Sequence, residues 1–207
     1  MSSDSSATIA TGAELVPKDC FAALDLETIY GRRAPLVVDL GCGDGSFLAA
    51  IASENPAADF LGIERLLGRV RTACRRIERA GLQNARVLCI EIAYAVERML
   101  PANSVAAFHL MFPDPWPKRR HAARRLVSAP FLVSIHRALR PDGTIRIATD
   151  DTSYFRHLLR LATGLPALFV VEPDAVPLST TSEFERRFTQ RGVEIHRVAL
   201  RKISPLT

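Results

Sequence analysis

The chain has 207 residues, the length of about one domain. Hydrophobic residues make up 48% of it and charged residues 24%, a balance that excludes a chain disordered throughout. The 27 Lys and Arg residues exceed the 22 Asp and Glu residues, and the net charge of +5 allows an anionic partner without requiring one.

Cysteine spacing and hydropathy indicate the compartment. The four cysteines include no C-x-x-C pair, as expected of a reduced protein. No apolar run approaches the roughly 18 residues that span a bilayer, and the first residues lack the basic start and apolar core of a signal peptide. The sequence therefore predicts a cytoplasmic protein that does not enter a membrane.

Strands and helices are predicted to alternate after an N-terminal extension. Residues 1–34 are expected to form a frayed tail, Met1–Gly12, and a short helix, Phe21–Tyr30, and residues 35–207 a single domain. Short apolar segments predict five strands, at Leu36–Leu40, Phe60–Ile63, Arg86–Ile90, Val105–Phe112 and Thr144–Thr149. Helices are predicted at Ser46–Glu54, from Leu66 to Gly81, at Ala93–Leu100, from Pro130 to a turn at Arg140–Gly143, and at Thr152–Ala162.

Two further strands, Ala167–Val171 and Val193–Leu200, are predicted around a helical piece, Ser182–Gln190. Strands and helices that alternate in this way predict an α/β fold, because parallel neighbours need crossover connections. We expect one mostly parallel sheet of about seven strands with helices on both faces. Ligands of such sheets bind beyond the carboxyl ends of the strands.

A glycine-rich segment follows the first predicted strand of the sheet. It reads Asp39-Leu40-Gly41-Cys42-Gly43-Asp44-Gly45, and glycines at alternate positions allow a tight turn and a close approach of the backbone to a ligand. A dinucleotide fingerprint needs glycine at position 46, which is Ser46. The segment therefore favours another nucleoside-containing ligand, and a plain strand-to-helix connection is the alternative.

Carboxylates end three successive predicted strands. Asp39, Glu64 and Glu91 are expected at one edge of the sheet, where acids accept hydrogen bonds from ribose hydroxyls. Three acids surround a nucleoside without offering a cation to a pyrophosphate. The pattern therefore predicts an adenosine ligand that carries a positive charge, such as S-adenosylmethionine.

A proline-rich loop follows the fourth predicted strand of the sheet. It reads Phe112-Pro113-Asp114-Pro115-Trp116-Pro117-Lys118-Arg119-Arg120-His121, and the three prolines restrict the backbone around Asp114 and Trp116. A carboxylate and an aromatic ring on one stiff loop can bind a flat base by its edge and its face. Five of the eight residues from 118 to 125 are Lys or Arg, which indicates a phosphate track.

The predicted helix after Glu64 carries six arginines. They are Arg65, Arg69, Arg71, Arg75, Arg76 and Arg79. The sequence leaves two interpretations of them, a contact with nucleic acid and a merely solvated polar face. The five histidines show no metal-ligand spacing, and we expect no metal site.

Together these residues give the chain a resemblance to the bacterial tRNA (guanine-N7-)-methyltransferases, within the class I S-adenosylmethionine-dependent methyltransferases. The resemblance covers roughly Val37–Arg201 and is carried by the proline-rich loop, by Arg124-Arg125-Leu126, and by Ala148-Thr149-Asp150 with Tyr154. It implies a Rossmann-like methyltransferase domain that forms 7-methylguanosine at guanosine-46 of the tRNA variable loop. S-adenosylhomocysteine would be the second product, and the protein would act as a monomer or homodimer.

The resemblance also implies roles for individual residues. The methyl donor would be bound by Asp39, Gly41, Gly43, Gly45, Glu64, Glu91 and Asp114, and Asp114 would also act in catalysis. The tRNA would be contacted by Lys118, Asp150, Ser182, Glu183, Phe184 and Glu185. Ser182 stands where the family usually has threonine, with Thr181 beside it, Asp151 where it often has tryptophan, and Glu91 where it usually has aspartate.

Two other functions remain open from the sequence. Asp-Pro-Pro-aromatic loops serve methyl transfer to exocyclic amino groups, but this loop reads Pro-Asp-Pro-Trp and lacks the second consecutive proline. An RNA-binding protein without catalysis would keep the basic residues, but it would not need the glycine segment with its acids. The identity of a methylated nucleoside separates these alternatives.

Overall fold

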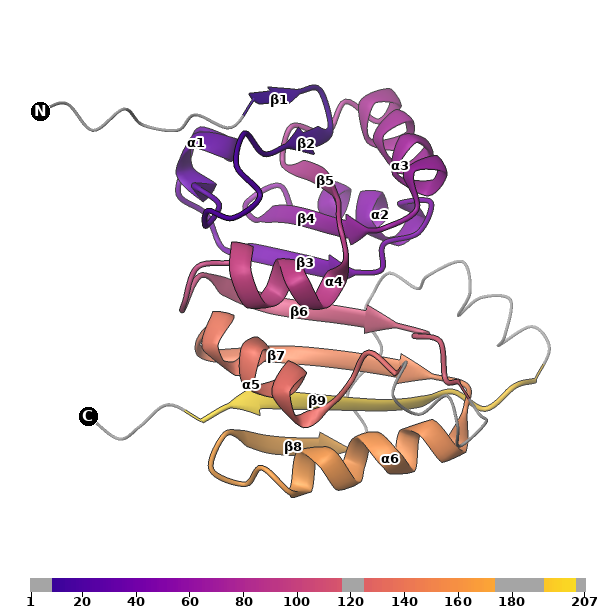
Figure 1. Cartoon of the computed structure of the whole chain (residues 1–207). Coiled ribbons are helices and arrows are strands. Elements are labelled where there is room, and N and C mark those ends of the chain that lie inside the picture. The colour runs from indigo at the N-terminus through magenta and orange to yellow at the C-terminus, as the bar shows by residue number, and fades with distance from the viewer. Residues whose placement is uncertain (1–8, 117–124, 174–191, 204–207) are drawn as a thin grey trace, which may run out of the picture. The chain divides into compact units, whose positions relative to one another are not determined.

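The computed structural model describes residues 9–116, 125–173 and 192–203, which belong to two compact units, 1–101 and 102–207 (Figure 1). Each unit combines a sheet with helices, so the α/β class predicted from the sequence is confirmed. The described residues form nine strands, because two short N-terminal strands join those that the sequence predicts. Within these residues, no helix is long and apolar enough to cross a membrane.

The first unit contains a five-stranded sheet in the order β1-β2-β5-β4-β3. Its strands are β1 (Ile9–Thr11), β2 (Glu14–Val16), β3 (Leu36–Leu40), β4 (Asp59–Glu64) and β5 (Ala85–Cys89). All neighbours are parallel except β1 and β2, which are antiparallel. The helices are α1 (Leu26–Tyr30), α2 (Ser46–Glu54), α3 (Leu67–Arg79) and α4 (Ile92–Tyr94), which continues as a π-helical turn, η1 (Ala95–Met99).

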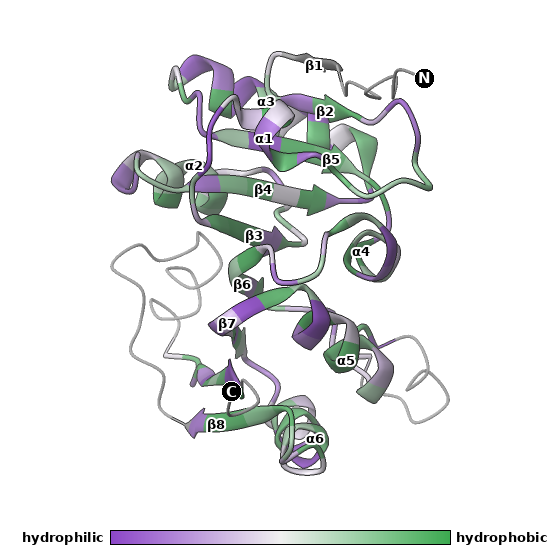
Figure 2. Ribbon diagram, turned by 90° about the vertical axis from the view of Figure 1, so that its left-hand side faces the viewer, coloured by the Kyte–Doolittle hydropathy of each residue, from purple (hydrophilic) through white to green (hydrophobic). Residues whose placement is uncertain are grey.

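Helices cover both faces of this sheet, and Figure 2 shows α2 and α4 on opposite sides of its strands. All six residues of β4 are buried, as expected of a strand between two parallel neighbours. The predicted apolar stripe of α3 is confirmed for Val70, Cys74 and Ile77, which are buried. Leu66 is different, because it precedes the helix and is 46% exposed.

The second unit contains a four-stranded sheet in the order β6-β7-β9-β8. Its strands are β6 (Val105–Met111), β7 (Leu139–Thr149), β8 (Phe169–Pro173) and β9 (His196–Lys202), and its helices are α5 (Ala129–Ala138) and α6 (Thr152–Thr163). β6 and β7 are parallel, whereas β9 is antiparallel to both β7 and β8. The helices α5 and α6 pack against each other (Figure 1).

The structure corrects three sequence predictions near element ends. The expected frayed tail contains β1, and β2 follows it, paired with β5 about 70 residues later in the chain, a partner that no local pattern reveals. The helix expected from Phe21 begins at Leu26, because Asp25 caps it by accepting a hydrogen bond from the Thr28 amide at 3.1 Å. The turn expected at Arg140–Gly143 lies inside β7, where Asp142 has a φ of 59°. The helical piece expected at Ser182–Gln190 lies outside the described residues.

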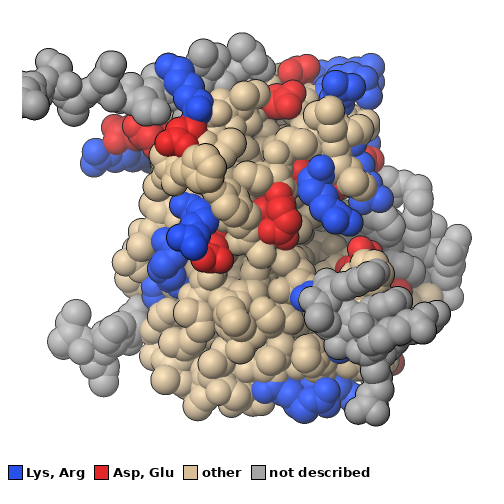
Figure 3. Space-filling view, viewed as in Figure 1, with Lys and Arg blue, Asp and Glu red and all other residues tan. Residues whose placement is uncertain are grey.

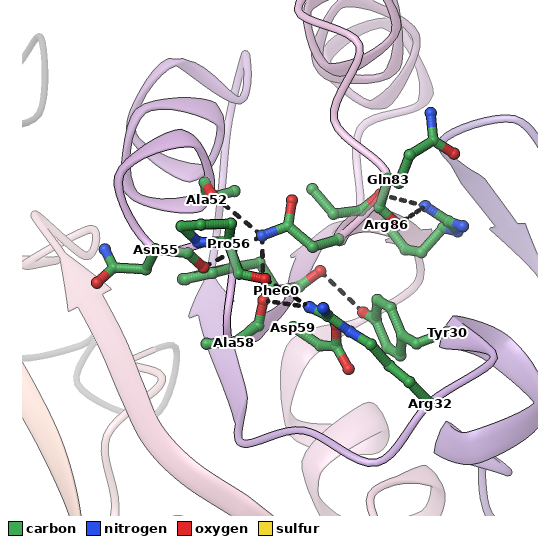
Figure 4. A network of polar contacts seen from close by, with 12 residues as sticks. Tyr30, Arg32, Ala52, Asn55, Pro56, Ala58, Asp59, Phe60, Gln83 and Arg86 are labelled. Carbon is green, nitrogen blue, oxygen red and sulfur yellow. Dashed lines mark hydrogen bonds and ion pairs between the residues drawn. The ribbon is translucent and has the colours of Figure 1, made fainter.

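A polar network closes the end of the first sheet at which β4 begins (Figure 4). Asp59 is buried and forms an ion pair with Arg32, whose Nη2 lies 2.7 Å from the Asp59 Oδ1. The same nitrogen donates to the carbonyl oxygens of Pro56 and Ala58 at 2.9 and 3.0 Å. Arg32 therefore fixes the chain between α2 and β4.

Asn84, which directly precedes β5, donates hydrogen bonds to the same segment. Its Nδ2 donates to the carbonyl oxygens of Ala52 and Ala58 at 3.0 Å each and to that of Asn55 at 3.3 Å. Asn84 is 9% exposed and its bond to Ala52 is buried, so the Ala52 carbonyl group depends on Asn84 and not on water.

Replacement of Asn84 is expected to destabilise the protein. Asn84→Ala leaves the buried Ala52 carbonyl oxygen without this donor, whereas the Ala58 carbonyl keeps Arg32 and the Asn55 carbonyl keeps the Ala58 amide. We expect the free energy of unfolding to fall by about 1 to 3 kcal/mol. Urea denaturation measures this change. Gln83→Ala is the control, because Gln83 is exposed and its substitution should change stability by less than about 0.5 kcal/mol. Equal stability of the two variants would contradict the role given to Asn84.

Candidate functional site

The glycine segment forms a tight turn between β3 and α2. Gly41, Gly43 and Gly45 have φ values of 81°, 57° and 75°, which side chains rarely allow. The amides of Gly41 and Cys42 donate to the carbonyl oxygen of Ile63 in β4, at 2.8 and 3.1 Å. A Cβ on Gly45 would stand 2.6 Å from the Cβ of Ala73 in α3, so this glycine also permits the packing of α3 against the turn.

The carboxylate of Glu64 holds this turn to the end of β4. Its Oε2 accepts a hydrogen bond from the Gly43 amide at 3.2 Å. Its Oε1 accepts from the amides of Arg65 and Leu66, both at 2.9 Å. Glu64 is only 6% exposed, and these amides, with the Arg69 guanidinium 3.9 Å away, compensate the burial of its charge.

Asp39 lies beside Glu64 in a different environment. It is 2% exposed, and its Oδ2 has no hydrogen-bond partner among the residues that the structure describes. Burial, and secondly the charge of Glu64, raise the pKa of Asp39 from 3.8 to about 7. A buried acid that has a raised pKa and an oxygen without a hydrogen-bond partner is suited to bind a cation or a hydrogen-bond donor of a ligand.

Glu91 follows β5 and has a structural role of its own. Its Oε2 accepts a hydrogen bond from the Tyr94 amide at 2.8 Å, so it caps the N-terminus of α4. In the parallel register Glu64 lies opposite Cys89, which places Glu91 two residues beyond the paired end of β5. Asp39, Glu64 and Glu91 therefore follow or end three neighbouring strands at one edge of the sheet, as the sequence predicts.

The raised pKa of Asp39 predicts a pH dependence of stability. Between about pH 4 and pH 7 the unfolded chain loses the Asp39 proton and the folded protein keeps it. The contribution of Asp39 to the free energy of unfolding should therefore fall as the pH rises through this window, by up to about 4 kcal/mol, and level off above it. Burial lowers the pKa of His109 to about 4, and this group contributes in the opposite direction over most of the same window, so the contribution of Asp39 is read as a difference between variants.

Asp39→Asn is expected to remove this contribution, because the amide has the same shape and no proton to lose. The stability of the unaltered protein relative to Asp39→Asn should therefore fall as the pH rises from 4 to 7. Guanidinium denaturation at pH 4, 5.5, 7 and 8 measures it. Asp19→Asn, at an exposed residue, should keep the pH dependence of the unaltered protein. Parallel pH profiles for Asp39→Asn and the unaltered protein would assign the titration to another group.

In the second unit, the described part of the proline-rich loop follows β6. Asp114 is exposed between Pro113 and Pro115. Phe112 and Trp116 have φ values of 54° and 42°, which are uncommon for residues other than glycine. The Phe112 amide donates to the carbonyl oxygen of Ala148 in β7 at 2.8 Å, which anchors the start of the loop.

Arg125 supports the other end of the described loop. Its Nε donates to the carbonyl oxygen of Pro115 at 2.9 Å and its Nη2 to that of Trp116 at 3.5 Å. The guanidinium also lies over the ring of Tyr154 in α6, 5.4 Å from its centroid. Burial raises the pKa of Tyr154. The charge of Arg125 acts to lower this pKa, and the charge of Asp114 acts to raise it further. The sequence does not reveal this support, although Arg125 and Tyr154 belong to the segments that carry the family resemblance.

Asp150 and Asp151 follow β7 and lie in different environments. Asp150 is exposed, whereas Asp151 caps α6 by accepting a hydrogen bond from the Tyr154 amide at 2.7 Å. Asp151 thus has a structural reason to stand where the family often has tryptophan. Lys118, Ser182, Glu183, Phe184 and Glu185, predicted to contact tRNA, lie outside the described residues, so their roles remain predictions.

Arg125 is expected to control the order of the loop around Trp116. Trp116 is the single tryptophan of the chain, so its fluorescence reports on this loop alone. Arg125→Ala removes the donors to two carbonyl groups, and it should lower the free energy of unfolding by about 1 to 3 kcal/mol and increase acrylamide quenching of Trp116. Arg160→Ala, at an exposed arginine of α6, should change neither quantity measurably. Unchanged quenching in Arg125→Ala would contradict the support described above.

The comparisons with known proteins agree with this geometry, first at the level of the fold. The antibiotic-resistance methyltransferase Kmr superposes with a TM-score of 0.63 at 20% identity, over 93% of this chain and 96% of that protein. An S-adenosylmethionine-dependent O-methyltransferase from Thermotoga maritima superposes with a TM-score of 0.58 at 16% identity, over 85% and 62% of the two chains. The fold is therefore that of the class I methyltransferases.

Sequence relatives define the family within this class. A family profile described as "Putative methyltransferase" matches residues 33–198. The tRNA (guanine-N(7)-)-methyltransferase of Edwardsiella ictaluri is 36% identical over 87% of this chain and 76% of its own length. The protein of the same name from Leifsonia xyli is 40% identical over 83% of this chain and 78% of its own length. The chain belongs to the tRNA (guanine-N(7)-)-methyltransferase family, as its resemblance predicts.

Proposed function

We propose that this protein transfers the methyl group of S-adenosylmethionine to N7 of a guanine in tRNA, with 7-methylguanosine and S-adenosylhomocysteine as products. The observation that carries the proposal is the identity of 36–40% to relatives of that name over more than four-fifths of the chain. The target is guanosine-46 of the variable loop, and the protein acts in the cytoplasm as a monomer or homodimer.

The first unit offers groups that fit the methyl donor. S-adenosylmethionine supplies a methyl group on a positively charged sulfur, next to an adenosine. The buried Oδ2 of Asp39 has no hydrogen-bond partner among the described residues, so it can accept a hydrogen bond from a cationic ligand. Glu64 accepts one amide hydrogen at Oε2, and a carboxylate oxygen has a second lone pair for a ribose hydroxyl. The backbone at Gly41, Gly43 and Gly45 allows close approach, and Glu91 completes the set of this unit. Asp114, of the second unit, is also proposed to bind the donor.

The second unit offers groups that fit the guanine and its tRNA. Guanine N7 carries a lone pair and no proton, so methyl transfer at this atom needs alignment and no general base. The base becomes cationic as the bond forms, and a carboxylate next to it stabilises that charge. We assign this role to Asp114, with Trp116 stacked on the base. Lys118, Asp150 and the segment Ser182–Glu185 contact the tRNA.

The direct test is methyl transfer to an unmodified tRNA transcript, followed by digestion and identification of the nucleoside. We expect 7-methylguanosine. A nucleoside methylated on an exocyclic amino group would instead show that the protein is an exocyclic-amino methyltransferase, the alternative that the sequence leaves open. Binding of tRNA without any methylated product would leave an RNA-binding protein.

Asp114→Asn is expected to lower kcat by about 100-fold or more, since the amide cannot compensate the positive charge of the methylated base. Steady-state kinetics at saturating tRNA and donor measure the change. Asp142→Asn is the control, because Asp142 is an exposed acid of the same unit and asparagine tolerates its φ of 59°. Near-normal turnover of Asp114→Asn would remove Asp114 from the mechanism.

A further inference from the structure

The exposed side of α3 is strongly basic. Six arginines lie between residues 65 and 79, and Glu78 is the single acid in this stretch. Figure 3 shows Lys and Arg side chains where Figure 1 places α3. Val70, Ala73, Cys74 and Ile77 are buried on the other side of the helix, which therefore presents its arginines from a well-packed element.

The structure separates the five of these arginines that lie in α3 itself into two groups. Arg76 forms an ion pair of 2.8 Å with Asp44 in the glycine turn, and Arg69 lies 3.9 Å from the Glu64 carboxylate. These two arginines connect α3 to the turn between β3 and α2. They already have an electrostatic role inside the first unit.

A second group, here called the arginine stripe, consists of Arg71, Arg75 and Arg79. All three are exposed, and none forms an ion pair within the residues that the structure describes. Arg75 donates to the Thr72 hydroxyl at 3.3 Å. The acid of the helix, Glu78, accepts a hydrogen bond from the Ala13 amide at 3.3 Å.

The spacing of the arginine stripe is unfavourable for an isolated helix. Its members are four residues apart, so their backbone positions follow one another at about 6 Å along one face, and like charges at this spacing repel one another. A solvated helix face usually alternates acids and bases at this spacing, which turns the same contacts into attraction. The repulsion disappears when the stripe meets a polyanion, and the guanidinium group binds phosphate oxygens with two parallel hydrogen bonds.

We propose that the arginine stripe of α3 binds the phosphate backbone of the tRNA substrate, in addition to the residues that contact the target guanine. The identity of the RNA rests on the proposed function. Contacts with phosphates hold and orient the RNA and do not read its bases. The stripe therefore contributes to tRNA affinity, and the methyl transfer step itself does not depend on it.

The test removes the three charges and keeps the helix. The triple variant Arg71→Gln, Arg75→Gln, Arg79→Gln uses a residue with nearly the same helix propensity as arginine. The control variant Arg98→Gln, Arg140→Gln, Arg160→Gln removes three exposed charges from other elements, so the net charge is the same. Circular dichroism and thermal unfolding confirm that both variants fold.

Binding of an unmodified tRNA transcript is measured by fluorescence anisotropy between 50 and 200 mM salt. For the stripe variant we expect the slope of log K against log salt to decrease by about 2 to 3, and Kd at 100 mM salt to rise about tenfold or more. The KM for tRNA should rise in parallel, while the single-turnover rate at saturating tRNA and the Kd for S-adenosylmethionine stay within about twofold of the unaltered protein. The control variant should keep most of the salt slope.

Two outcomes overturn the inference. One is a stripe variant that binds tRNA with the same salt slope as the control variant. The other is a stripe variant that loses binding to phosphatidylserine vesicles and not to tRNA, which would make α3 a lipid surface. A failure of the proposed function is distinct, because the unaltered protein would then form no 7-methylguanosine while the binding comparison still decides the role of the stripe.

Discussion

The carboxylate of Glu64 is the interaction on which the candidate donor site depends. It joins the end of β4 to the glycine turn after β3 through the Gly43 amide, and it fixes the first residues that lead into α3. A buried charge is tolerated there because backbone amides from two segments donate to it. The same charge raises the pKa of its neighbour Asp39. One side chain therefore sets both the shape of the turn and the electrostatics of the acid beside it.

This arrangement favours a cationic ligand for a physical reason. Burial, and secondly the charge of Glu64, raise the pKa of Asp39 to about 7, so the free protein favours the protonated form below neutral pH. A positively charged ligand compensates the second negative charge and favours the ionised form. Binding of the proposed cationic donor beside Asp39 would therefore be coupled to release of the Asp39 proton near neutral pH.

Sequence patterns predict the strands, the glycine turn and the helices of the fold better than the contacts that support them. The boundaries of β3 and α2 agree with the prediction, because an apolar strand, a glycine turn and an amphipathic helix are all local signals. β1 and β2 depend on pairing with each other and with β5, and the support of the loop by Arg125 depends on Tyr154, which lies 29 residues further along the chain. Local patterns do not reveal such partners. Asp151 is different, because the predicted start of the helix at Thr152 is correct and an acid directly before a helix is a local signal for a cap.

The two groups of arginines on α3 follow from the same constraint that shapes the turn. The helix must pack closely on the turn, where Gly45 leaves room for Ala73, and Arg69 and Arg76 lie near enough to balance Glu64 and Asp44. Helical periodicity then places Arg71, Arg75 and Arg79 away from these acids, and none of the three forms an ion pair within the described residues. Polar or acidic residues at these three positions would be equally compatible with the packing of the helix on the turn and with a soluble exposed face. Their positive charge is therefore best explained by an anionic partner outside the chain.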